Sequence, residues 1–545
     1  MKRRDLLGKM AAVASGGLLL NSTTARARPL PEDAVGSPAG MQETAIHATV
    51  YDVRKFGAKA DGQTNNAVAI QKAIDACAKG GGGVVLLDQG VFLSGGIKLK
   101  SHVELHITST ATLMGSKHVA DYNHDQNFKQ GDGIRSFINA EGCEQIAISG
   151  TGTIDGQGQL FTADKGYSVR PYLVYLRRSK DIRLTNITLH NSAVWACWLL
   201  QCERVKVEGV RIDNPISPNR DGIDLDGCRE VLISNCSFKT EDDSIAFKAS
   251  EPGFPCRDIV VTNCLISSKC AAIRFGPDAV ADIENVSVSN CVIRDTRLNG
   301  IKIQEAMGAA IRNLVFSNLV MDNVHGPISL RCAGWQLEPN QSAPFEINDR
   351  NWENGKLQNI LFDNIRGTAP KDNIAMSITG TSKTRPQQIT FSNIDITFVG
   401  GGTAAQGARR EVPDLDRHYP EMFIFGNLPA YALYLHHVSG IVMNNVLFRL
   451  QSDDLRPAIV CDDVDDLELS DVRLAGSRKS ESVIRLQKSK HVFIHGSRTL
   501  NETGIFLRVE GVESKDIVLS GNKLNAASQV FETTADVAKD AIAQL

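Results

Sequence analysis

Short segments in which apolar and polar residues alternate recur along most of the chain, and valine and isoleucine fill most of the apolar positions. Clear examples are IVVTNCLI around Asn263 and VSVSNCVI around Asn290. Alternation with a period of two residues predicts β-strands, and these segments carry no ten-residue stripe with helical spacing. The pattern therefore indicates a protein built from many short strands.

These segments are copies of one repeat with the form apolar-x-apolar-Ser/Thr-Asn-x-x-apolar. Successive copies at Asn235, Asn263, Asn290 and Asn318 lie 28, 27 and 28 residues apart. Such a period is typical of solenoids, whose units bury their apolar faces only against neighbouring units. Asparagine suits a corner because it tolerates left-handed backbone, and its amide can pair with the next copy. Leucine-rich repeats also carry an asparagine, but their period is shorter. The period and the strand pattern together predict an all-β, single-stranded, right-handed parallel β-helix.

The repeats place one β-helix domain over residues 49–525. Residues 65–79 form an amphipathic helix, which we expect to cap the first coil because solenoids need covered ends. Two intervals exceed one period, and their extra residues, 333–355 and 400–429, are rich in proline, glycine, asparagine and charge. This composition predicts loops that leave the stack. Residues 526–545 are expected to close the other end as a cap or tail, with a short helix from Phe531 to Leu545.

The N-terminus has the pattern of a targeting segment. Arg3 and Arg4 precede an apolar run from Met10 to Leu20, and Ala25-Arg26-Ala27 follows as a small-x-small cleavage pattern. We expect a signal peptide over residues 1–27, a linker over 28–48, and a mature protein without a membrane anchor. The paired arginines resemble a twin-arginine signal, with an ordinary secretory signal as the alternative. Either signal predicts a periplasmic or secreted protein.

Charge and cysteine content limit the kinds of partner and metal site that the protein can have. The chain has 59 Lys and Arg against 62 Asp and Glu, so it lacks the basic field that would attract nucleic acid. Cys236, Cys264 and Cys291 occupy the same place in successive repeats, which predicts a column of buried thiols. A bridge within a second group stays open at this point, and no cysteine or histidine spacing predicts a zinc site. We therefore expect no metal. The members of the second group are Cys197, Cys202, Cys228, Cys256 and Cys270.

The densest group of acidic residues falls in two adjacent repeats. Asp221 lies in the segment NRDGID, and Asp242 and Asp243 follow 21 and 22 residues later in EDDSIAFK. One coil of separation brings these carboxylates to roughly 5 Å along the stack. Clustered carboxylates cannot all ionise freely, so one of them can serve as an acid at moderate pH. The alternatives are acids that are simply solvated and acids that bind Ca²⁺.

Several motifs resemble the polygalacturonases of glycoside hydrolase family 28. They are SPNRDGIDLDGCREVLISNCSF, EDDSIAFK and NGIKIQ, together with YDVRKFGAKADG and the glycine-rich segment from Gly150 to Gly158. The resemblance implies an inverting hydrolase of pectic polymers that needs no cofactor. It also implies that Asp242 protonates the glycosidic oxygen while Asp221 and Asp243 hold and deprotonate water.

The chain departs from the family pattern beside these aspartates. Arg220 replaces a threonine, Glu241 replaces a glycine, and no histidine stands near Ala271–Gly276, where the family has one. Lys302-Ile303-Gln304 stands where the family has Arg-Ile-Lys. This chain therefore has one cation where the family has two, and its lysine cannot bind a carboxylate through two hydrogen bonds as arginine does. These differences predict a substrate other than plain polygalacturonate, for example rhamnogalacturonan or another rhamnose- or uronate-containing glycan.

Further candidates for contact with the sugar surround the aspartates. Among the tryptophans, Trp335 and Trp352 are expected to stack on sugar rings and Trp198 to lie in the core. The segment Tyr419–Tyr431 resembles a loop of bacterial family members that would wall one end of the groove, which suggests exo action. The predicted substrate-binding residues are Arg220, Glu241, Lys248, Arg274, Lys302, Gln304 and Trp335.

Two other classes of function stay open at this point. A β-helix lyase would use Arg274 or Lys302 as a base beside Ca²⁺, and a glycan-binding solenoid would have no activity because fold does not imply function. For the hydrolase we expect a monomer whose partner is an acidic polysaccharide or oligosaccharide. We expect it to bind neither nucleic acid nor membrane.

Overall fold

The computed structural model describes residues 49–126, 133–161, 169–214, 216, 218–335, 351–371 and 374–545. Contacts divide the chain into residues 1–47 and a second unit, Ala48–Leu545, to which everything below refers. The predicted signal peptide and linker lie outside the described residues. No helix in the described ranges is long and apolar enough to cross a membrane.

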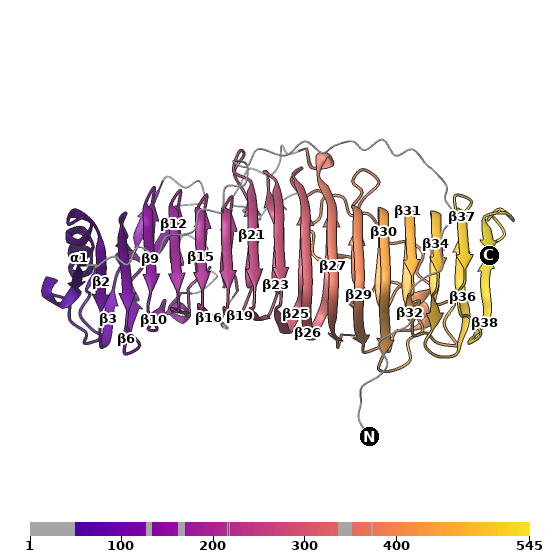
Figure 1. Cartoon of the computed structure of the whole chain (residues 1–545), viewed down its shortest axis with the longest axis horizontal. Helices are drawn as coiled ribbons and strands as arrows, with labels where there is room; N and C mark the ends of the chain where they lie inside the picture. Colours follow the sequence, from indigo (N-terminus) through magenta and orange to yellow (C-terminus); the bar gives the residue numbers. More distant parts are fainter. Residues whose placement is uncertain are drawn as a thin grey trace, which may run out of the picture. The chain divides into compact units, whose positions relative to one another are not determined.

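The second unit is a right-handed parallel β-helix, as the sequence predicts (Figure 1). Each coil adds strands to three parallel stacks, here named A, B and C in the order in which the first coils meet them. Strand β17 illustrates the ladder, because Ile223 pairs with Cys197 in the preceding coil and with Ile245 in the following one.

The strands that belong to single stacks are the following. Stack A holds β1 (Val50–Asp52), β2 (Gly83–Leu87), β5 (Val103–Ile107), β9 (Glu144–Ser149), β12 (Lys180–Thr185), β15 (Glu203–Glu208), β18 (Arg229–Ser234), β21 (Cys256–Thr262), β24 (Ile283–Ser289), β34 (Lys490–His495), β37 (Lys515–Ser520) and β39 (Ile542–Gln544). Stack B holds β3 (Gly90–Ser94), β6 (Ala111–Gly115), β10 (Thr153–Asp155), β13 (Thr188–His190), β16 (Arg211–Asn214), β19 (Ser237–Thr240), β22 (Leu265–Ser268), β32 (Arg473–Leu474) and β35 (Arg498–Thr499). Stack C holds β4 (Ile97–Lys98), β8 (Ile134–Glu141), β11 (Tyr172–Arg177), β14 (Cys197–Leu200), β17 (Ile223–Asp226), β20 (Ile245–Ala249), β23 (Ala271–Ala279), β28 (Met376–Thr379), β33 (Ile484–Gln487), β36 (Thr503–Glu510) and β38 (Ala527–Thr533).

The longer strands bend through corners and pass from one stack to the next. They are β25 (Val292–Glu305), β26 (Ala310–Cys332), β27 (Lys356–Ala369), β29 (Gln387–Phe398), β30 (Leu433–Leu450) and β31 (Ile459–Ser470). Strand β7 (Asn123–Asp125) pairs antiparallel with β8. Short 3-10 turns are η2 (Val53–Phe56), η3 (Val119–Asp121), η4 (Gly158–Leu160), η7 (Trp352–Asn354) and η8 (Met422–Phe425).

The repeated asparagines form the predicted ladder between stacks A and B. Asn318 has a left-handed backbone with φ 55°. It donates to Asn290 at 3.1 Å and accepts from Asn364 at 2.8 Å. Each asparagine thus adopts the left-handed backbone that the corner requires and forms a hydrogen bond to the next coil.

The interior is apolar along the whole stack. Phe247 stacks on Phe275 with ring centroids 4.4 Å apart. The predicted thiol column of Cys236, Cys264 and Cys291 is confirmed, since all three side chains are buried. All twelve cysteines lie in the described part of the chain and are free thiols, so the bridge left open from the sequence does not form.

The two ends of the stack are closed differently. Helix α1 (Ala67–Lys79) covers the first coil with Ile70, Ala73, Ile74 and Cys77, as predicted. It starts at Ala67 because Asn65 accepts the hydrogen bond of the Ala67 N–H. The closing helix predicted between Phe531 and Leu545 is wrong. Strands β38 and β39 occupy this segment, because pairing with β36 and β37 satisfies their backbone groups.

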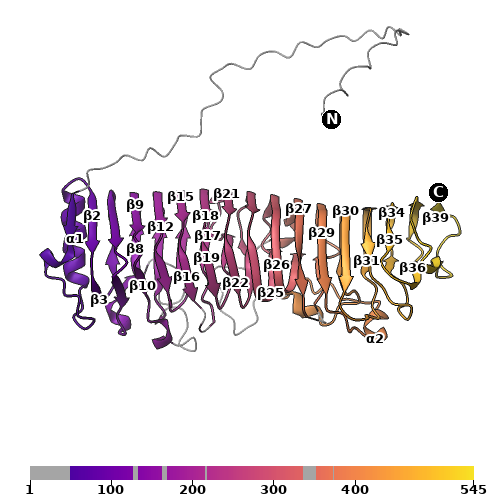
Figure 2. The same ribbon diagram turned by 60° about the horizontal axis from the view of Figure 1, so that its bottom comes forward.

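Two long segments separate successive strands, residues 333–355 between β26 and β27 and residues 399–432 between β29 and β30. Residues 336–350 of the first lie outside the described residues, and η7 follows them. The second joins β29 to β30 and carries α2 (Ala404–Gly407) and η8. Figure 2 shows α2 outside the stacked coils. Residues 409–421 of this insertion, here named the cover segment, lie over the outer face of stack C, where the hydrogen bonds described below hold them.

Candidate active site

Three aspartates meet where stack B turns into stack C. Asp221 precedes β17, and Asp242 and Asp243 precede β20 one coil later. The Gly222 N–H donates to the Asp243 carbonyl at 2.9 Å, so the two turns are stacked directly. A Cβ atom at Gly222 would lie 2.2 Å from the Ser244 carbonyl oxygen, so only glycine allows this approach. The adjacency predicted from the repeat period is confirmed.

Asp243 is the ionised member of the group. It is fully buried, and its carboxylate accepts from Arg274 Nη1 at 2.5 Å and from the Ala271 N–H at 3.2 Å. Burial alone would raise its pKa. The charges of Arg274 and Lys302 outweigh burial and lower the pKa of Asp243 to about 2.

Asp242 lies beside it in a different environment. Its side chain is only partly buried and accepts from the backbone N–H groups of Asn219 at 3.2 Å and Asp243 at 3.0 Å. Burial, and then the charge of Asp243, raise the pKa of Asp242 above its usual range. Two neighbouring carboxyl groups are thus driven toward opposite protonation states, which is the arrangement that acid and base catalysis require.

Asp221 shares this electrostatic field. Burial raises its pKa well above the ordinary value, and the charges of Asp224, Asp242 and Asp243 raise it further. Burial also raises the pKa of Asp224 to about 7, although Lys248 Nζ lies 3.4 Å away. The sequence analysis assigned no role to Asp224, which follows Asp221 by three residues and faces the same side of stack C as Lys248.

Lys248 lies at the centre of a buried polar cluster. Its ammonium group also lies 3.4 Å from Asp278 and 3.9 Å from the centroid of the Trp195 ring. These contacts hold Trp195 and the aspartates in one wall of the site.

The predicted cations Arg274 and Lys302 occupy one row of stack C, paired in register. Lys302 is buried and forms a 2.7 Å ion pair with Glu421 of the cover segment. Arg274 donates to the Tyr419 hydroxyl at 2.6 Å. The charges of both residues are therefore compensated by protein groups.

Gln304 joins this contact between stack and cover segment. Its side-chain amide donates to the Pro420 carbonyl at 2.6 Å and accepts from Arg274 at 3.2 Å. The sequence analysis placed Tyr419–Tyr431 at one end of a groove but did not identify Tyr419 and Glu421 as partners of the cations.

The other predicted contact residues are spread around the site. Arg220 is completely buried and donates to Asn191 Oδ1 at 3.1 Å, and burial lowers its pKa to about 10. Glu241 pairs with Lys269 at 2.6 Å. Trp335 packs edge-on against Tyr419 with centroids 4.9 Å apart. Substrate contact by these residues stays a prediction.

Two of the tryptophan predictions are decided by burial. Trp198 is buried in an aromatic cluster, as expected. Trp352 was expected to stack on sugar, which is wrong, since only 5% of it is exposed and Lys383 covers its ring.

Comparison with known proteins identifies the family of this chain. The sequence profile described as Glycosyl hydrolases family 28 matches residues 77–411, more than half of the chain. The chain belongs to glycoside hydrolase family 28. The matched segment carries all three aspartates at the coil junction, and the family assignment makes this protein a glycoside hydrolase.

Several relatives of this chain are named polygalacturonases. A Vitis vinifera protein named a probable polygalacturonase is 31% identical over 278 residues, covering 46% of this chain and 56% of that protein. The chain thus spans little more than half of that relative's length. The endo-polygalacturonase of Pectobacterium carotovorum is 27% identical over 365 residues, covering 62% of this chain and 86% of that enzyme. An exopolygalacturonase structure from Thermotoga maritima shares the fold with a TM-score of 0.56 and 21% identity, covering 74% of this chain and 92% of that one.

Proposed function

We propose that this protein is an exported hydrolase that cleaves glycosidic bonds in a pectic or related acidic glycan. Asp242 donates its proton to the glycosidic oxygen, and Asp243 accepts a proton from the attacking water. The observation that carries this assignment is the opposite direction of the two pKa shifts on adjoining residues. The elevated pKa of Asp242 keeps a proton available, while Arg274 keeps Asp243 charged.

Asp221 completes the group by orienting the water. It lies one coil from Asp243, and its protonated carboxyl can donate or accept a hydrogen bond at the same water. The nearest oxygens of Asp242 and Asp243 lie within 4.8 Å. This is shorter than the roughly 6.5–9.5 Å of most inverting enzymes, so inversion is proposed on the family resemblance.

The substrate we propose carries no carboxylate at the subsite of Lys302. A galacturonate there would need a free cation, but Glu421 already neutralises Lys302 at 2.7 Å. A neutral sugar such as rhamnose avoids this competition. Rhamnogalacturonan or another mixed glycan is therefore preferred to homogalacturonan, and the cover segment favours cleavage from a chain end.

The decisive experiment combines an Asp242→Asn variant with product analysis. We expect kcat on a responsive pectic oligosaccharide to fall by about 10²–10⁴-fold, with unchanged binding and an unchanged melting temperature. NMR of the first product should show inversion at the anomeric carbon. Retained turnover would exclude the proposed acid, and a product with a new double bond absorbing in the ultraviolet would reveal a lyase.

Export is part of the proposal and rests on the N-terminal pattern alone. Replacement of Arg3 and Arg4 by lysine should stop a twin-arginine route while leaving an ordinary secretory signal active. Fractionation of cells that produce both forms distinguishes the two routes.

A further inference from the structure

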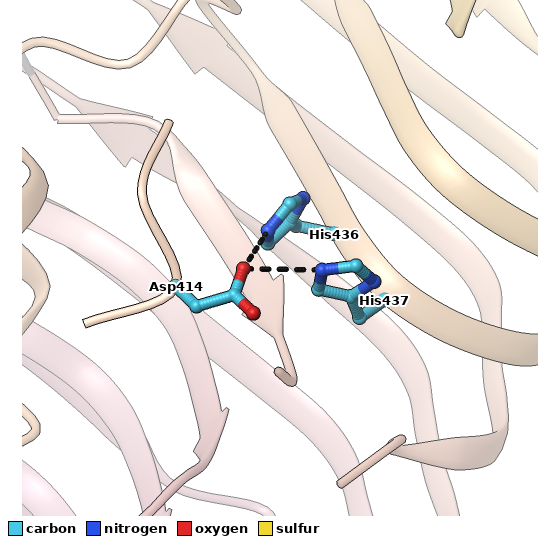
Figure 3. Close-up of side chains that lie close together, drawn as sticks. All are labelled: Asp414, His436 and His437. Atoms are coloured by element: carbon cyan, nitrogen blue, oxygen red, sulfur yellow. Dashed lines mark hydrogen bonds and ion pairs between the residues drawn. The ribbon is translucent and has the colours of Figure 1, made fainter. Parts of the chain in front are cut away.

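The cover segment meets stack C at a second cluster of polar side chains, separate from the three aspartates. Asp414 Oδ1 lies 2.9 Å from His436 Nε2 and 3.1 Å from His437 Nε2. Figure 3 shows both imidazole rings turned toward the single carboxylate oxygen. One oxygen and two imidazole nitrogens therefore converge on one point.

Neighbouring residues of a strand normally point to opposite faces, so His436 and His437 should not share a partner. His437 has a left-handed backbone with φ 52°, which turns its ring to the side of His436. The ring centroids lie 4.0 Å apart. The backbone at this corner thus brings two imidazoles together.

Asp414 is held in place independently of the histidines. Its second oxygen accepts from the Ser382 N–H at 3.0 Å, and Arg331 donates to the carbonyls of Asp414 and Leu415 at 2.8 Å. The carboxylate is therefore presented to the rings by a preformed segment.

The far nitrogen of each ring faces another carboxylate. His437 Nδ1 lies 2.5 Å from Asp463, and His436 Nδ1 lies 3.1 Å from Asp462, without meeting hydrogen-bond geometry. The hydrogen bond to Asp463 orients the His437 ring so that its Nε2 is directed at Asp414. Carboxylates fix metal-binding histidines in this way.

The three candidate ligand atoms, one from each of Asp414, His436 and His437, lie within 4.8 Å of one another. They are therefore close enough to hold a single metal ion. The carboxylates of Asp414, Asp462 and Asp463 surround the two rings, and Arg385 pairs with Asp463. This excess of negative charge favours a bound cation.

We propose that Asp414, His436 and His437 bind one divalent transition metal, with Zn²⁺ as the best match. Two imidazoles and one carboxylate leave a fourth position for water, which is a known zinc ligand set. The metal would tie the cover segment to stack C. That segment carries Tyr419 and Glu421, so the metal would also stabilise their contacts with Arg274 and Lys302.

The test uses the full chain without a histidine tag, treated with chelator and then titrated with Zn²⁺ by calorimetry. We expect one saturable site and a rise in melting temperature. Co²⁺ should give visible bands of four- or five-coordinate cobalt without the thiolate charge-transfer band of cysteine ligation. These readouts involve no substrate, so their outcome is independent of the proposed hydrolysis.

Variants separate this site from other metal-binding groups. Asp414→Asn and His437→Gln should each abolish the single site, and Asp463→Asn should weaken it by about 10–100-fold. His491→Ala is the matched control, because His491 pairs with Asp465 on an exposed corner away from the proposed site. This variant should bind Zn²⁺ with the affinity of the wild-type protein. Melting temperatures in chelator show whether each variant is folded. Absence of saturable binding by the wild type, or equal binding by folded Asp414→Asn, overturns the proposal.

Discussion

Glu421 forms a 2.7 Å ion pair with Lys302, a residue 119 positions earlier in the chain. Both side chains are buried, and Lys302 stands where the family resemblance implies a residue that grips a galacturonate. Under the proposed function, a carboxylate of the protein therefore occupies the position of a substrate carboxylate. This relationship has consequences for specificity that can be measured.

Removal of the carboxylate by Glu421→Gln should widen the substrate range. A free Lys302 can pair with galacturonate, so we expect KM for galacturonate oligomers to fall relative to that for neutral-sugar oligomers. The variant also leaves a buried cation without its partner, which should lower the free energy of unfolding by on the order of 3 kcal/mol. Steady-state kinetics and urea unfolding measure the two effects.

Glu353→Gln provides the matched control for that substitution. Glu353 also pairs with a lysine, Lys383, but both side chains are exposed, so neither specificity nor stability should change beyond about 1 kcal/mol. An unchanged ratio of the two KM values in Glu421→Gln would show that Lys302 does not select the substrate.

The pH dependence of kcat/KM should be bell-shaped, and its acid limb should lie at low pH. Asp243 must be ionised, and its pKa of about 2 means that activity is lost only as the pH falls toward 2. Asp242 must be protonated, and its raised pKa means that activity declines as the pH rises through a value above the usual aspartate range. Initial rates measured across this range define both limbs.

Arg274→Gln should move the acid limb of that profile upward. Loss of the guanidinium removes the largest effect that opposes burial at Asp243, so the base protonates at higher pH. Arg257→Gln, a change at an exposed arginine of stack A, should leave the profile unchanged. An acid limb that does not move in Arg274→Gln contradicts the assignment of Asp243 as base.

The asparagine ladder should contribute through backbone conformation as well as hydrogen bonds. Asn318→Ala puts alanine at φ 55°, where its side chain cannot form the hydrogen bonds that asparagine forms. The free energy of unfolding should fall by about 1–2 kcal/mol for the backbone conformation, and further for the lost ladder hydrogen bonds. Asn318→Gly loses the same hydrogen bonds but tolerates the conformation. Urea unfolding should therefore rank the glycine variant as the more stable of the two.

Buried free thiols should be unreactive in the folded protein. Of the twelve cysteines, eleven are buried and Cys270 is partly exposed, and burial raises the pKa of Cys270. We expect a thiol reagent to modify Cys270 slowly and the remaining eleven only after unfolding. Cys270→Ser should abolish the slow phase, and several fast-reacting thiols in the native protein would contradict this packing.

The sequence by itself determined the β-helix, because that information is local and repeated. A period of two within each strand and one asparagine in each coil set the inward face and the corner, and the spacing sets the length of the coil. The same regularity placed Asp221 one coil from Asp243. The C-terminal strands were missed because their pairing depends on β36 and β37 rather than on their own pattern.

Only the tertiary structure decided what surrounds the aspartates. The pairing of Lys302 with Glu421 and the meeting of Asp414 with His436 and His437 depend on the path of an insertion that obeys no repeat. A loop's course is set by contacts distant in sequence, and protonation follows from the burial and charge that those contacts create. The candidate catalytic aspartates can therefore be identified from the sequence, whereas their environment depends on the contact between the cover segment and stack C.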